Sequence, residues 1–240
     1  MSAARPSGET PMRFLPRSHV EAFVDPDEQV DGGGAVWVHR SAFGVFVAAP
    51  VEPRDGERHF NVPEPGTLRL NAGLELRLAG VEDEAARLIR ERLPERRALA
   101  PADRELLATY FAALGIRLSS RFGDLDDAEA LRGFEELLAV LREMGWVFWE
   151  AEPPFYFVSS SAPFHAAFPK DDGLVQGQEL HAPGVELTLP LTPRLALHAT
   201  WTRRGELWRR AGEGVLLELN ARTLQRAHRF VLAPKPAIPL

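Results

Sequence analysis

Three consecutive serines, Ser159, Ser160 and Ser161, form the most site-like feature of the sequence. They lie within residues 146–164, the most aromatic and most strand-like stretch of the chain. A serine nucleophile needs a histidine base within reach, and this turn lacks the Gly-x-Ser-x-Gly elbow. A hydroxyl-rich turn more often bonds to its own backbone. The residues themselves therefore favour backbone capping over nucleophilic catalysis.

Two glutamates and an arginine form a second candidate group. Glu75 and Glu82 lie two helical turns apart on a predicted helix, residues 70–92, at the border of its apolar stripe. Arg117 lies at the edge of the apolar stripe on the next helix, and Arg121 lies close to that stripe. Because a buried guanidinium needs a carboxylate, we predict a Glu82–Arg117 ion pair. A structural pair that joins the two helices is favoured over an anion or phosphate site.

The histidines and acids of the sequence match no standard metal site. His-Glu-x-x-His and His-x-His are absent, and there is no cysteine. One loop collects several potential ligands, namely His165, Asp171, Asp172, Glu179 and His181. Their spacing favours a polar surface loop over a cation site. We therefore expect neither a metal nor a cofactor.

One segment, Trp201 to Arg210, is both basic and aromatic. It contains two tryptophans and four arginines. Such a segment can stack on single-stranded nucleic acid. It can equally form a hairpin tip whose arginines lie over indole faces. The acidic character of the whole chain, with a formal charge of −6, favours the hairpin and argues against a duplex-DNA binder.

The remaining composition is that of an ordinary globular protein. The chain has 240 residues, of which 45% are hydrophobic and 26% are charged. No stretch approaches the roughly 20 apolar residues of a membrane span, so we expect no membrane insertion. The lack of cysteine fits a cytoplasmic protein. Residues 1–12 are polar, and we predict a disordered tail there.

Helices precede most of the strands in the predicted order of elements. We expect helices over residues 70–92, 101–122, 126–144 and 214–230, and strands over residues 35–40, 43–49, 146–150, 155–159, 185–190 and 195–202. In strand 146–150, helices should cover Val147 and Trp149, and loops should cover Trp146 and Phe148. This order predicts an α+β fold, with three to four helices on a mostly antiparallel sheet, as a single domain over residues 13–235.

Several landmarks, taken together, resemble a bacterial family known only as domain of unknown function 4238. Residues 12–16 (Met-Arg-Phe-Leu-Pro) are similar to its Gln-His-aromatic-Val-Pro motif, and residues 159–163 (Ser-Ser-Ser-Ala-Pro) are similar to its Thr-Ser-Asp-Asn-Pro motif. Further matches are residues 23–25, Glu75, Glu82, Arg117, residues 190–193, and Asn220 before a helix. The family brings no established activity.

The departures from the family pattern concern its two most reactive groups. The motif histidine is replaced by Arg13, and the motif aspartate by Ser161. The resemblance implies that these two motifs share a site, so we expect residues 159–162 near Arg13 and Arg17 at the end of a central strand. Arginines facing Ser160 and Ser161 would bind an anion weakly but supply no general base.

These observations favour a non-catalytic binding or protein-interaction module with a degraded family site. Its protein partner is unidentified, and single-stranded nucleic acid is the less favoured ligand. The alternative is a hydrolase or nuclease-like enzyme that acts on a phosphate-containing substrate through Arg117, Glu75, Glu82 and Ser160.

Overall fold

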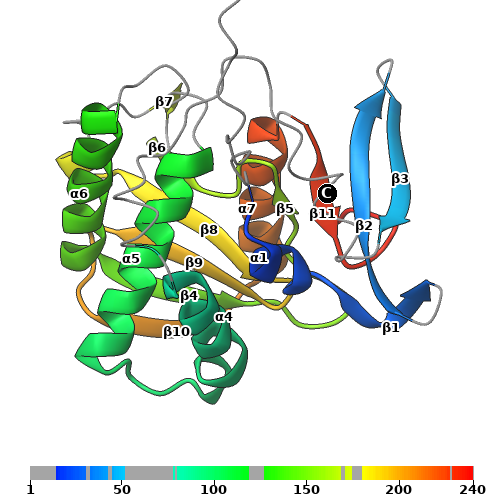
Figure 1. Ribbon diagram of the computed structural model, residues 1–240, viewed down its shortest axis with the longest axis horizontal. Helices are drawn as coiled ribbons and strands as arrows, with labels where there is room; N and C mark the ends of the chain where they lie inside the picture. Colours follow the sequence, from blue (N-terminus) through cyan, green and yellow to red (C-terminus); the bar gives the residue numbers. More distant parts are fainter. Residues whose placement is uncertain are drawn as a thin grey trace, which may run out of the picture.

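The computed structural model has the predicted α+β architecture, with helices packed on mostly antiparallel strands in a single domain (Figure 1). It describes residues 15–30, 33–42, 45–51, 78, 80–118, 127–168, 171–174, 180–227 and 229–239. The predicted tail, residues 1–12, lies outside this described part. The strands form two sheets rather than the one that we expected.

A six-stranded sheet forms the larger half of the protein. Its strands, in spatial order, are β10 (Glu206–Arg210), β4 (Gly145–Glu150), β9 (Leu195–Thr200), β8 (Glu186–Thr192), β6 (His165–Phe168) and β7 (Asp171–Leu174). Every neighbouring pair is antiparallel except β10 and β4, which run parallel. The alternating sequences of β8 and β9 place their leucines on one face of this sheet.

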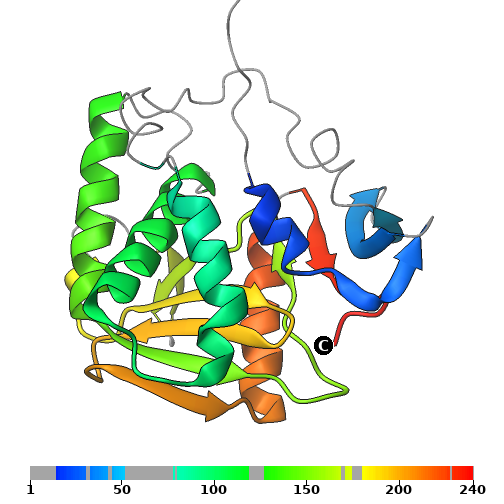
Figure 2. The same cartoon turned by 60° about the horizontal axis from the view of Figure 1, so that its bottom comes forward.

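That leucine face carries a layer of helices, α4 (Val81–Glu91), α5 (Pro101–Leu118) and α6 (Asp127–Glu143), with a short 3-10 turn η1 (Leu93–Glu95) after α4. Figure 2 shows the three α-helices standing over this sheet. Trp146 and Phe148 face them and are fully buried, and the ring of Phe111 in α5 lies 5.6 Å from that of Trp146. Our prediction that loops cover Trp146 and Phe148 was therefore wrong.

The opposite face of the six-stranded sheet is covered by α7 (Glu213–Arg226). Leu216 and Leu219 of this helix pack against Ala196 of β9 and Trp149 of β4. Val147 is also buried. Both faces of strand β4 are therefore covered, as we predicted, and a helix lies on each side.

A second, five-stranded sheet lies beside the first (Figure 1). It follows the short helix α1 (Arg17–Glu21) and contains β1 (Asp25–Val30), β2 (Gly33–Ala42), β3 (Val45–Val51), β5 (Ser159–Ser160) and β11 (Val231–Ala233). Strand β11 lies between β2 and β5 and pairs with both. This pairing brings the serine strand β5 close to the N-terminal strands.

The strand predicted for residues 155–159 is reduced to β5 because a side chain takes the place of a neighbouring strand. Asn220 of α7 is fully buried, and its Oδ1 accepts a hydrogen bond from the Val158 N–H at 3.0 Å. Its Nδ2 donates to the Tyr156 carbonyl at 3.0 Å. The Asn220 amide thus satisfies backbone groups that a β-ladder would otherwise satisfy. Asn220 lies inside a helix, not before one as the family resemblance implies.

No helix in the described ranges combines the length and the apolar character that a bilayer span requires.

Candidate functional site

A histidine reaches the serine turn, and the sequence analysis did not predict it. Nε2 of His19 in α1 lies 2.8 Å from Oγ of Ser159 in β5. Burial lowers the pKa of His19 to about 4, so its ring is neutral at neutral pH. A neutral imidazole beside a hydroxyl is the pair that nucleophilic catalysis uses. Here, however, the exposed fraction is 3% for His19 and 0% for Ser159.

The other two serines bind backbone groups, as expected of a hydroxyl-rich turn. Oγ of Ser160 accepts a hydrogen bond from the Ala162 N–H at 3.2 Å, and Oγ of Ser161 accepts one from the Arg229 N–H at 3.1 Å. Ser160 is fully buried and Ser161 is half-buried. Each serine of the turn therefore has a hydrogen-bond partner inside the fold.

Arg17 does not bind the serine turn, which corrects our prediction for this residue. Its side chain is exposed and pairs with Glu21 one helical turn away, with 2.6 Å between Nε and Oε1. Helix α1 does lie against the turn, but His19 makes the contact. Arg13, the other predicted partner, lies outside the described residues.

The predicted glutamate–arginine pair is only partly described. Glu82 lies in the first turn of α4 and is half-buried, and Arg117 lies in the last turn of α5. Glu75 and the side chain of Arg117 lie outside the described part of the protein. The Glu82–Arg117 ion pair therefore stays a prediction.

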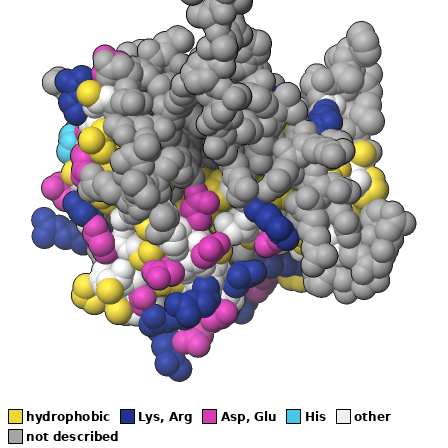
Figure 3. Space-filling view, in the orientation of Figure 1, with side chains coloured by type: hydrophobic (Ala, Val, Ile, Leu, Met, Phe, Trp, Pro, Cys, Tyr) yellow, Lys and Arg dark blue, Asp and Glu magenta, His cyan; other side chains and the backbone are white. Residues whose placement is uncertain are grey.

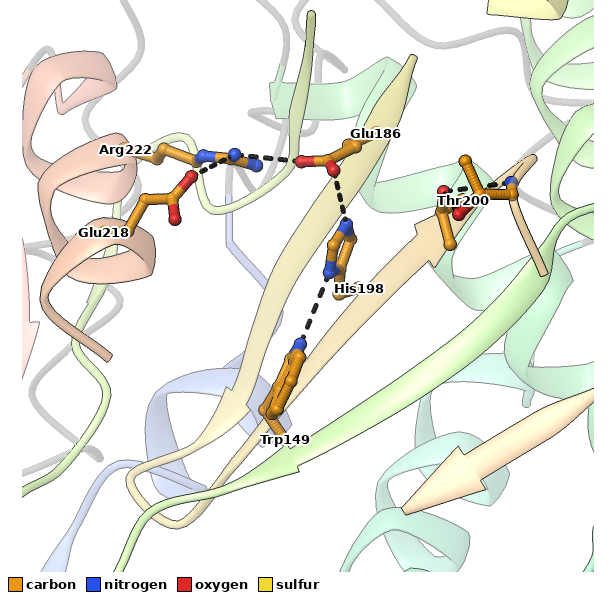
Figure 4. A network of polar contacts seen from close by, with 7 residues as sticks. Trp149, Glu186, His198, Thr200, Glu218 and Arg222 are labelled. Carbon is orange, nitrogen blue, oxygen red and sulfur yellow. Dashed lines mark hydrogen bonds and ion pairs between the residues drawn. The ribbon is translucent and has the colours of Figure 1, made fainter. Parts of the chain in front are cut away.

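A polar network on the α7 face of the six-stranded sheet was also missed (Figure 4). Oε1 of Glu186 in β8 lies 3.3 Å from Nε2 of His198 in β9, and Oε2 lies 2.9 Å from the guanidinium of Arg222 in α7. Arg222 also pairs with Glu218, and the Trp149 indole N–H donates to Nδ1 of His198 at 3.3 Å. The network therefore ties β4, β8 and β9 to α7.

The bond from Trp149 fixes the roles of the His198 ring nitrogens. Nδ1 accepts from Trp149, so in the neutral ring the proton lies on Nε2 and faces Glu186. Burial raises the pKa of Glu186, but its contacts with His198 and Arg222 outweigh burial and hold that pKa below its usual value. Since the proton lies on Nε2 and the lone pair of Nδ1 accepts from Trp149, the neutral His198 ring has no free lone pair to act as a general base.

The strand alternation contains a signal that could have found this network. Glu186 and His198 are the only ionisable residues of these two strands, and both strands were predicted. In the observed register, Glu186 is opposite Thr200, and His198 is opposite Thr188. These residues therefore share one face. What the sequence does not reveal is that Arg222 approaches from a helix to pair with them.

The loop that collects potential metal ligands contains strands instead. His165 lies in β6 and is buried, whereas His181 is exposed and its ring lies 5.8 Å from that of Trp201. The side chains of Asp171 and Asp172, and all of Glu179, lie outside the described residues. Among the side chains that are described, no three histidines or carboxylates are placed to hold a metal ion.

The basic, aromatic segment is not the hairpin that we predicted. Strand β10 pairs with β4 instead of with β9, so residues 201–205 cross the end of β4. A Cβ on Gly145 would lie 2.6 Å from the Arg203 backbone, so glycine permits this crossing. The ring of Trp208 stacks on Phe148 with 4.4 Å between centroids, and the Trp201 indole N–H donates to the Leu180 carbonyl at 2.8 Å. Both indoles are therefore engaged within the fold.

Ion pairs connect the helix layer to this end of the sheet. Arg96 pairs with Glu150 at 2.7 Å, and Arg104 pairs with Glu206 while its guanidinium lies 4.1 Å from the centroid of the Trp146 ring. Figure 3 shows basic and acidic side chains mixed over the lower part of the molecule, where α4 lies. Most charge in this region is therefore compensated locally.

Searches of protein-family models, of curated proteins and of solved structures found no match to this chain. The resemblance to the domain of unknown function 4238 family therefore rests on the sequence motifs alone.

Proposed function

We propose that the protein is a non-catalytic binding or protein-interaction module of a bacterial cytoplasm, and that its serine turn is the degraded site of the family it resembles. One observation carries this proposal. The hydroxyls of Ser159, Ser160 and Ser161 are all bonded within the fold, and Ser159 and Ser160 have no exposed surface. A nucleophile has to contact its substrate, and the hydroxyls of Ser159 and Ser160 do not reach the surface.

The charge of the chain supports a protein partner over duplex DNA. The formal net charge is −6, whereas binding to duplex DNA requires a basic footprint. The arrangement of His198 supports the absence of catalysis in a second region, because the lone pair of its Nδ1 already accepts a hydrogen bond from Trp149.

The second candidate is a hydrolase or nuclease-like enzyme acting on a phosphate-containing substrate. The contact between His19 and Ser159 favours it, since a serine and a histidine 2.8 Å apart are the first two members of a nucleophilic site. Such an enzyme would have to open the region around α1 to admit its substrate.

Hydrolysis assays separate the two candidates. We expect 4-nitrophenyl phosphate, bis(4-nitrophenyl) phosphate and 4-nitrophenyl acetate to be hydrolysed at the buffer rate by the wild type, Ser159→Ala and His19→Gln. Ser161→Ala serves as a matched control, because Ser161 only accepts a backbone hydrogen bond. Turnover by the wild type that Ser159→Ala and His19→Gln abolish, and that Ser161→Ala retains, would establish the enzyme instead.

A further inference from the structure

Strand β10 is an edge strand with an unpaired side. It stands first in the order of the six-stranded sheet, and β4 is its sole partner among the described strands. Figures 1 and 2 both show it at the rim of the sheet. The unpaired side of an edge strand presents backbone donors and acceptors that an extended peptide can bind.

The hydrogen bonds to β4 identify which backbone groups face outward. The Trp146 N–H donates to the Gly205 carbonyl at 2.8 Å, and the Ala211 N–H donates to the Glu150 carbonyl at 2.8 Å. Because backbone groups alternate in direction along a parallel strand, the odd-numbered residues from 205 to 211 bond to β4. The N–H and C=O groups of Glu206, Trp208 and Arg210 therefore point away from the sheet.

This strand is held rigidly in place. Trp208 stacks on Phe148, and Glu206 pairs with Arg104, which also donates to the Met144 carbonyl at 2.7 Å. A partner that binds here loses little freedom in ordering the strand, because the strand is already ordered.

The charge around the strand is positive and partly uncompensated. Arg203, Arg204 and Arg209 are exposed, and none of them has an ion-pair partner in the described part of the protein. Arg210 forms an ion pair with Glu152, with 3.1 Å between Nε and Oε1, and both side chains are exposed. We define the β10 edge as the outward backbone of residues 206, 208 and 210 together with the side chains of Arg203, Arg204 and Arg209. This edge is therefore basic, although the whole chain has a net charge of −6.

We propose that the β10 edge binds an extended acidic segment of a partner protein, which adds to the sheet as a further strand. This inference gives the proposed binding module a surface and a class of partner, and it rests on that proposed function. On one face of the added strand, carboxylates would lie near Arg209. On the other face, an apolar side chain would lie against the half-buried Trp208.

Two other ligands, a second copy of this chain and single-stranded nucleic acid, fit the β10 edge less well. A second copy of this chain would bring the same unpaired arginines together, and like charges on an edge strand oppose pairing. Single-stranded nucleic acid requires free aromatic faces, whereas Trp208 is stacked on Phe148 and Trp201 packs against the core beside His181. The outward N–H and C=O groups also match a peptide backbone.

Fluorescence anisotropy with a labelled peptide of alternating glutamate and valine tests the proposal. We expect saturable binding that weakens with added salt, and no binding of the matched peptides in which glutamine or lysine replaces glutamate. A glutamate–valine peptide that is N-methylated at every residue should also fail, because neither of its edges can donate hydrogen bonds to β10.

Variants of the protein then locate the site. Arg203→Glu and Arg209→Glu should each weaken binding about tenfold, whereas Arg132→Glu, an exposed arginine of α6, should leave it unchanged. Arg210→Pro removes one outward N–H, which an edge strand tolerates, and should weaken binding at least about tenfold beyond Arg210→Ala. Circular dichroism and thermal unfolding confirm that each variant is folded.

Four results would overturn the proposal. They are no binding of the glutamate–valine peptide, equal binding of its N-methylated form, tighter binding of oligo-dT, and dimers that Arg210→Pro abolishes. The hydrolysis assays are independent of this test. Turnover that depends on Ser159 would refute the proposed function even if the peptide binds, whereas loss of peptide binding without turnover refutes the edge alone.

Discussion

In two histidines of this protein, Nε2 lies close to a polar side chain, but in opposite surroundings. His19 of α1 is buried against β5, and its Nε2 lies 2.8 Å from the neutral hydroxyl of Ser159. His198 is 18% exposed and meets the carboxylate of Glu186, while its Nδ1 accepts from Trp149. Burial without a counter-charge keeps His19 neutral, because it disfavours the charged ring. Neither histidine is a free base, because His19 is inaccessible and the Nδ1 lone pair of His198 accepts from Trp149.

The largest expected effect on the free energy of unfolding comes from the protonation of His19. Burial lowers the pKa of His19 to about 4 in the folded protein, whereas in the unfolded chain its pKa is near the ordinary histidine value of 6.5. The stabilising contribution is therefore complete above the unfolded pKa and is lost as pH falls toward the folded pKa, by about 1.4 kcal/mol per pH unit. Urea unfolding between pH 7 and pH 5 should show this loss.

Replacing His19 measures how much of the loss of stability at low pH comes from this residue. His19→Gln keeps a hydrogen-bonding side chain beside Ser159 but cannot titrate, so its stability should fall about 2 kcal/mol less than that of the wild type between pH 6.5 and pH 5. His181→Gln, at an exposed histidine, is the matched control and should behave as the wild type does. Identical pH slopes for wild type and His19→Gln would mean that His19 is not buried in solution.

A smaller effect on the free energy of unfolding is expected from Glu186 on the α7 face, and it falls in a different pH range. The pKa of Glu186 is lowered in the folded protein, so its stabilisation is present above its unfolded pKa and is lost as pH falls through the folded one. Glu186→Gln should cost about 1–2 kcal/mol at pH 7 and almost nothing near pH 2. Urea unfolding at both pH values measures this, with the exposed Glu91→Gln as control. An equal cost at the two pH values would contradict the charge pairing.

The smallest effect concerns the indole that bonds to His198. Trp149→Phe removes the N–H donor and should cost about 0.5–1 kcal/mol in the free energy of unfolding at pH 7. Trp208→Phe is the matched control, because the buried Trp208 Nε1 has no hydrogen-bond partner within the described structure and phenylalanine can still stack on Phe148. If Trp208→Phe costs as much as Trp149→Phe, the effect reflects packing rather than the bond to His198.

The elements that could be predicted from the sequence are those with local periodicity. Helices α5 and α6 and strands β8 and β9 lie close to their predicted ranges, because a stripe or an alternation of apolar residues spans each one. Residues 201–210 were assigned to a hairpin tip because the whole chain is acidic, and that argument cannot reveal that β10 pairs in parallel with β4, which lies far earlier in the chain.

The candidate site was less predictable because its contacts are non-local. His19 and Ser159 are 140 residues apart, and neither lies in a motif that indicates the other. The serine turn could be singled out by its composition, but its partners could not be identified. The role of Asn220 could not be predicted either, because a single asparagine in a helix gives no sign that its side chain bonds to backbone groups in place of a neighbouring strand.

Strand β11 has a consequence for the order in which the protein folds during synthesis. It separates β2 from β5 in the sheet, although almost the whole chain lies between β2 and β11 in the sequence. On the ribosome, the β2–β3 pair therefore emerges early, and the backbone groups of residues 37–39 that face β11 stay unpaired until residues 231–233 leave the exit tunnel. Release of this strand is thus the step that joins the early and late parts of the chain, and a chaperone would have its longest opportunity to bind just before it.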